Sequence, residues 1–137
     1  MISNHKIIGM DIKALLSTLW IFVLFNMIFR DLHEFGRPGF LEEIMTGIVN
    51  GVQITEGLML LGGIMAEIPI SMVLLSRVLK YKINRWANII AGAITIVIVI
   101  QNGAADLDDM FFATIEIVSL SFIVWCAWKW RKPLEHN

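Results

Sequence analysis

The chain has 137 residues, of which 57% are hydrophobic and only 17% are charged. Soluble domains are about 45–50% apolar and about 25% charged, so much of this surface requires a non-aqueous solvent. The net charge of -1 argues against the basic face that nucleic-acid binding needs, and the single cysteine, Cys126, excludes an internal disulfide.

Four windows are long and apolar enough to cross a bilayer, which takes about 20 mostly apolar residues. They cover residues 14–33, 54–79, 86–105 and 107–128. We expect helices in all four, because lipid cannot satisfy open backbone groups. The sequence therefore predicts an all-α fold, in which residues 1–137 form a single membrane domain built as a transmembrane four-helix bundle.

The connection after the first span is longer than the other two and contains an amphipathic stretch. It opens with the turn signal FGRPG and continues as FLEEIMTGI. In a helix, one face of that stretch would hold Phe40, Leu41, Ile44, Met45 and Ile48. This pattern predicts a short interfacial helix on the outer surface, and the alternative is a loop that caps the bundle.

Charges are segregated along the chain, and this predicts the orientation of the spans. Nine of the 11 basic residues lie in the two tails and in the connection between the second and third spans: Lys6, Lys13, Arg77, Lys80, Lys82, Arg85, Lys129, Arg131 and Lys132. The opposite side keeps Arg30 and Arg37. Because Lys and Arg accumulate in cytoplasmic loops, we expect a multi-pass protein of the inner (plasma) membrane with both termini in the cytoplasm.

The second span carries an acid, Glu67, near its midpoint. A charge at this depth costs about 2.5–3.5 kcal/mol on insertion scales, so we expect Glu67 to be protonated or to face polar groups. Gly63, Glu67 and Ser71 recur at a spacing of four and share one helical face, which we expect to point inward. Pro69 cannot donate to the carbonyl of Met65, which frees that carbonyl for another partner.

The other spans also carry polar stripes, and in the third span Asn88, Gly92 and Thr95 share one helical face. We therefore expect a bundle with a polar interior. The candidates for ligand or proton binding are Glu67, Glu116, Asn88, Thr95, Ser71 and Asn26. If Glu67 and Glu116 face each other, they would share a proton or jointly hold a cation. In the alternative, each acid is protonated and hydrogen-bonded to a neighbouring side chain, and serves to join the helices.

No metal site and no cofactor is predicted. His33 with Asp31 and Glu34 could bind a metal on the outer rim, but we interpret these residues as a solvated acidic rim. Cys126 lies in an apolar run and is interpreted as inert packing. The chain has no Gly-rich phosphate loop and no Ser/His/Asp set, so we do not expect an enzyme.

The stretch MAEIPISMVLLSRVLKYKINRWANIIAG, residues 65–92, resembles a family of small bacterial four-span integral membrane proteins classed as a domain of unknown function. Residues 16–31, LSTLWIFVLFNMIFRD, and residues 115–130, IEIVSLSFIVWCAWKW, extend the resemblance over most of the chain. It implies four membrane helices and carries no established activity.

Two functions follow from these observations as hypotheses. In the first, the polar interior supports proton- or cation-linked binding or transport of a small molecule, with Glu67 and Glu116 as the acidic groups. The expected partners are then the lipid bilayer, a small-molecule or cation ligand, and a second copy in a homodimer that encloses a path. In the alternative, the protein is a non-catalytic membrane accessory or assembly subunit.

Overall fold

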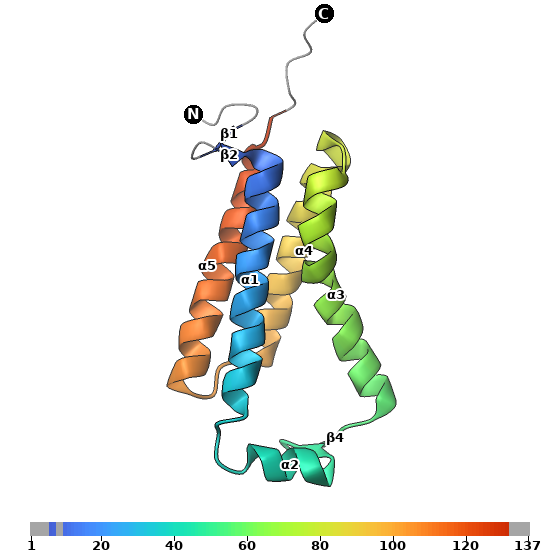
Figure 1. Ribbon diagram of the computed structural model, residues 1–137, viewed down its shortest axis with the longest axis vertical. Coiled ribbons are helices and arrows are strands. Elements are labelled where there is room, and N and C mark those ends of the chain that lie inside the picture. The colour runs from blue at the N-terminus through green and yellow to red at the C-terminus, as the bar shows by residue number, and fades with distance from the viewer. Residues whose placement is uncertain (1–5, 8–9, 132–137) are drawn as a thin grey trace, which may run out of the picture.

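Four long helices run alongside one another in the computed structural model, which describes residues 6–7 and 10–131 (Figure 1). They are α1 (Ile12–Glu34), α3 (Glu56–Val78), α4 (Tyr81–Asn102) and α5 (Leu107–Lys129). Each is long and apolar enough to cross a membrane. The predicted all-α transmembrane bundle is confirmed, and the chain is a multi-pass membrane protein. The helix of the third predicted span, α4, begins at Tyr81, earlier than the expected residue 86. Lys132, one of the basic residues used to predict the orientation, lies outside the described residues.

The helices form a ring in the order α1, α3, α4, α5, because α1 and α4 each pack against both α3 and α5. Figure 1 shows that the start of α1 and the end of α5 lie at the same end of the bundle. The turn from α4 to α5 passes through Gly103, whose φ of 71° lies in the left-handed region that favours glycine.

The helix ends have side-chain partners where the backbone leaves groups unpaired. Thr55 caps α3 by accepting a hydrogen bond from the backbone N–H of Leu58 at 3.1 Å. At the end of α5, Arg85 donates from Nε to the carbonyl of Ala127 at 3.0 Å and from Nη2 to that of Trp128 at 3.1 Å. A cation at a helix C-terminus also opposes the helix dipole, so Arg85 holds α4 and α5 together.

The apolar core fills the half of the bundle that holds the start of α1 and the end of α5. Trp20 of α1 and Leu120 and Ile123 of α5 are fully buried there, as is Cys126. The buried residues of α3 are Pro69, Met72 and Ser76, all in its second half.

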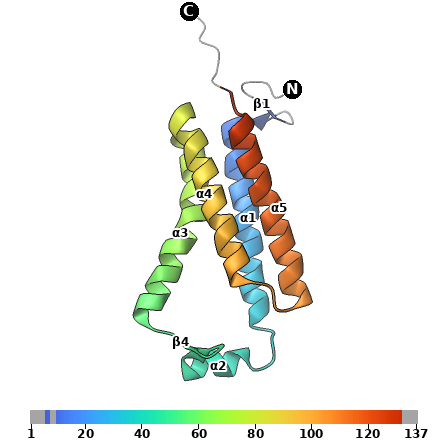
Figure 2. The ribbon, with the colours of Figure 1, turned by 180° about the vertical axis from the view of Figure 1, so that it is seen from behind.

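The first half of α3 leans away from the rest of the bundle, and both views show this divergence (Figures 1 and 2). The bend has a local cause, because Pro69 lacks the N–H that would bond to the carbonyl of Met65. The divergence leaves the opposite end of the bundle, at the end of α1 and the start of α5, loosely packed.

The long connection between α1 and α3 crosses that open end (Figure 1). It contains α2 (Phe40–Thr46), followed by a short antiparallel hairpin of β3 (Ile48–Val49) and β4 (Val52–Gln53). The predicted short helix is confirmed, and none of its residues is buried in the bundle. A second hairpin, of β1 (Lys6–Ile7) and β2 (Met10–Asp11), precedes α1.

Candidate functional site

A cavity of about 560 Å³ lies at the open end of the bundle, beside the divergent half of α3. Its size is within the range of small-molecule sites. Seven charged side chains line it: Arg30, Asp31, Glu34, Arg37, Asp106, Asp109 and Glu116. Carboxylates outnumber guanidiniums by five to two in this space, so the cavity has an excess of negative charge when all groups are ionised.

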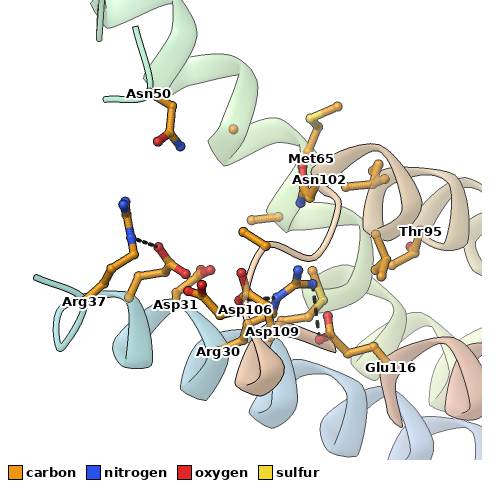
Figure 3. A pocket seen from close by; sticks show the side chains of 17 residues that line it. Arg30, Asp31, Arg37, Asn50, Met65, Thr95, Asn102, Asp106, Asp109 and Glu116 are labelled. Atoms are coloured by element: carbon orange, nitrogen blue, oxygen red, sulfur yellow. Dashed lines mark hydrogen bonds and ion pairs between the residues drawn. The ribbon is translucent and has the colours of Figure 1, made fainter. Parts of the chain in front are cut away.

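Arg30, in the last turns of α1, lies at the centre of these charges (Figure 3). Its Nε donates to Oδ1 of Asp109 at 3.2 Å, and its Nη2 donates to the carbonyl oxygen of Gly103. Its Nη1 lies 3.7 Å from Oε2 of Glu116. Arg30 is 9% exposed and Asp109 is 8% exposed, so this is a buried ion pair whose charges must satisfy each other.

Glu116 forms the inner end of the cavity and is only 1% exposed. Among the described residues, its Oε2 accepts no hydrogen bond, because the nearby Nη1 of Arg30 is too distant. Thr95 lines the same cavity, but its hydroxyl donates to the carbonyl of Ala91 at 2.7 Å. Glu116 therefore keeps an unused acceptor in a place where an unpaired polar atom is unfavourable.

Three carboxylates meet at the mouth of the cavity. Glu34, Asp106 and Asp109 each place a carboxylate oxygen within 4.8 Å of the others. Arg37 borders this group, with its Nε 3.2 Å from Oε2 of Glu34. His33, which the sequence analysis had grouped with Glu34, is instead 3.6 Å from Asp108 through Nδ1.

A second polar layer, closer to the start of α1, surrounds Asn88. Its Oδ1 accepts from the indole N–H of Trp20 at 2.7 Å and from the hydroxyl of Ser76 at 3.2 Å. Its Nδ2 donates to the side-chain oxygen of Asn84 at 2.7 Å. Both groups of the Asn88 amide are thus used inside the protein, and this buried network ties α1, α3 and α4 together.

The structure corrects the expected orientation of Glu67. Its side chain is exposed on α3 and does not line the cavity that contains Glu116. The prediction that Glu67 points inward is therefore wrong, and the condition that Glu67 and Glu116 face each other is not met. The inward face of α3 is centred on Pro69 and Met72. Glu67 lies two positions before Pro69, which at 100° per residue places it about 200° around the helix, on the opposite side.

Two further predicted site residues, Asn26 and Ser71, also lie outside the cavity. Asn26 donates from its amide to the carbonyl of Phe22 on its own helix at 2.9 Å, and Ser71 is half-buried on α3. Of the six predicted candidates, the structure brings only Glu116 and Thr95 together at the cavity.

Sequence reasoning missed the roles of Arg30 and Asp109. A signal for Asp109 was present, because Asp109 and Glu116 are seven residues apart and so share a helical face. A signal for Arg30 was its position as a basic residue at the outer end of the first predicted span. Their pairing depends on the contact between α1 and α5, which joins residues 79 positions apart.

Comparison with known proteins gives a family and no activity. No curated protein and no solved structure matches the chain. The model of a family of unknown function, DUF6326, matches residues 6–135, nearly the whole chain. The chain, a four-span membrane protein with an acidic cavity at one end of its bundle, therefore belongs to the DUF6326 family.

Proposed function

We propose that the protein binds a small cationic solute in the acidic cavity, in a proton- or cation-linked step that supports its transport. The observation that carries this proposal is the buried Glu116 carboxylate, with one oxygen unpartnered at the inner end of a cavity in which acids outnumber bases. Buried carboxylates in membrane proteins commonly mark ion or proton pathways.

The contacts of Arg30 support a mechanism of displacement. Its guanidinium is the counter-ion of Asp109 and approaches Glu116. A cationic solute that donates hydrogen bonds would compete for the same two carboxylates. A proton on Glu116 removes the negative charge and weakens the hold on the solute, so proton binding and solute binding oppose each other.

The proposed orientation follows from the charge segregation. The basic residues of the connection between α3 and α4 lie at the end that also holds the start of α1 and the end of α5. With that end in the cytoplasm, as the excess of Lys and Arg favours, the cavity opens to the opposite side of the membrane.

Proton-linked uptake into proteoliposomes tests the proposal. The probe is radiolabelled guanidinium, which carries the same group that Arg30 places beside Asp109 and Glu116. We expect an acidic interior to drive accumulation with the wild type, and Glu116→Gln to reduce it to the level of protein-free liposomes. Asp108→Asn removes an acid outside the cavity lining and retains wild-type uptake.

Two results would contradict the proposal. One is wild-type uptake no greater than that of protein-free liposomes. The other is undiminished uptake by Glu116→Gln, which would show that the buried carboxylate takes no part in the step.

The exposed face of α3 supports the homodimer as the transporting unit. Glu67 lies on this face in an apolar helix, and an added Cβ at Gly63 would meet no atom within 4 Å. Two such faces related by a two-fold axis are self-complementary, because Gly63 of each copy permits close approach of the two helices. A second copy at this face would also shield Glu67 from lipid.

A further inference from the structure

The mouth of the cavity combines carboxylates from two parts of the chain, the end of α1 and the start of α5. Glu34 comes from the last turn of α1, Asp106 from the connection between α4 and α5, and Asp109 from the first turn of α5. Their ligand oxygens lie within 4.8 Å of one another, a spacing at which one ion can contact all three. Three carboxylates at this distance repel one another unless a cation lies between them.

Asp106 also forgoes its usual local partner. It occupies the N-cap position of α5, where an aspartate normally accepts a hydrogen bond from the first turn of the helix. Its side chain makes no such bond and instead lines the cavity (Figure 3). The carboxylate of Asp106 is therefore available to a ligand, and α5 lacks a side-chain cap at this end.

A second, independent observation comes from the inner end of the same cavity. Glu116 is 1% exposed, lines the cavity and has an unpartnered Oε2. The guanidinium of Arg30 is shared between Glu116 and Asp109, so it does not balance both carboxylates. The protein's own cations leave this space negatively charged, which is the condition for binding a cation from solution.

We propose that Glu34, Asp106 and Asp109 bind a divalent metal ion of the hard, oxygen-preferring class to which Ca²⁺, Mg²⁺ and Mn²⁺ belong. Carboxylate oxygens are the ligands these ions prefer, and the trio contains no histidine or cysteine that would favour zinc. Arg30 contacts Asp109 through Oδ1 and Arg37 contacts Glu34 through Oε2. Each of these carboxylates has a second oxygen for the metal.

This inference deepens the proposed function by naming an ion for the mouth of the cavity. It rests on the proposed function, because both require the cavity to carry an excess of negative charge. The ligand sets differ, however. Glu116 is absent from the trio, so a metal at the mouth would neutralise Asp109 and release Arg30 to pair with Glu116 or to yield to a solute.

Manganese binding to the purified full-length chain in lipid nanodiscs tests the proposal. Electron paramagnetic resonance measures free Mn²⁺, and competition with Ca²⁺ and Mg²⁺ ranks the ions. We expect one bound Mn²⁺ per chain and an affinity about tenfold or more weaker in Asp106→Asn, because the site loses one charged ligand. Asp106 is exposed, so its variant should fold.

Asp108→Asn is the matched control. It removes the same charge from the same segment, but Asp108 lies outside the trio and pairs with His33. We expect its Mn²⁺ affinity to stay within about twofold of the wild type, because Asp108 supplies no ligand oxygen and its carboxylate lies 3.6 Å from Nδ1 of His33. Absence of stoichiometric Mn²⁺ binding by the wild type, or an equal loss in Asp106→Asn and Asp108→Asn, would overturn the proposal.

Glu116→Gln separates this inference from the proposed function. We expect this variant to lose guanidinium uptake while it retains Mn²⁺, because Glu116 is not among the three ligands. Retained uptake together with lost Mn²⁺ binding would contradict both assignments, whereas absence of Mn²⁺ binding in a wild type that transports guanidinium would remove the metal site alone.

Discussion

Nη1 of Arg30 lies 3.7 Å from Oε2 of Glu116, close enough for electrostatic attraction but not for a hydrogen bond. The same guanidinium donates to Asp109 at 3.2 Å. The one guanidinium of Arg30 on α1 is thus the counter-ion of two buried acids on α5, and both helices line the cavity. This arrangement is the physical basis for assigning the site to cations, since it leaves negative charge unbalanced inside the protein.

Removing Arg30 should be strongly destabilising. Arg30→Met leaves Asp109 and Glu116 without their counter-ion, and breaking a buried pair by deleting one partner costs about 3–5 kcal/mol. We expect the free energy of unfolding in detergent to fall by roughly this amount. Arg37→Met is the control, because the Arg37–Glu34 pair is partly exposed and worth about 0–1 kcal/mol. Similar losses in the two variants would contradict a special role for Arg30.

The Asn88 network should contribute to stability and not to transport. Asn88→Ala leaves the indole N–H of Trp20 without its acceptor in a buried place, which costs about 1–3 kcal/mol. Asn26→Ala, which removes only a bond to the same helix, should change the free energy of unfolding by less than about 0.5 kcal/mol. Chemical denaturation measures both. A larger effect in Asn26→Ala would refute the assigned burial.

At Gly92, α4 and α5 lie too close together for a side chain to fit. An added Cβ would lie 2.7 Å from Cγ2 of Val124, and this β-branched side chain has little freedom to move. We expect Gly92→Ala to lower stability by about 1–3 kcal/mol, as overpacking does. Gly57→Ala meets only an ordinary contact at 3.9 Å and should be neutral or mildly stabilising.

Relief of the clash provides the check on Gly92. Adding Val124→Ala to Gly92→Ala removes the contacting methyl groups and should restore part of the lost stability. A double variant no more stable than Gly92→Ala would show that the loss has another origin.

The exposed face of α3 should lie against a second copy in the membrane. In a Cys126→Ala background, Gly63→Cys should form a disulfide-linked dimer in native membranes, because the two α3 helices approach at their glycines. Val118→Cys, on an exposed face of α5, is the control and should remain monomeric. Crosslinking of Gly63→Cys to one different protein would favour the accessory-subunit alternative, and equal dimerisation of both variants would refute a specific interface.

Several features followed from the sequence because they depend on local chemistry. Length and hydropathy determined the four spans, since a bilayer imposes both. The amphipathic stretch after FGRPG determined α2. The polar and small residues Asn88, Gly92 and Thr95 determined the inward face of α4, and all three are buried.

The candidate site depended on the tertiary structure. Periodicity states which residues share a helical face, but not which face turns toward the protein, and this is why Glu67 was placed inward although it is exposed. The bend at Pro69 and the packing of α3 on α1 and α4 decided its direction. Likewise, only the contact of α1 with α5 brought Arg30 to Asp109 and Glu116, because an ion pair across 79 residues is set by the order of the helices in the bundle.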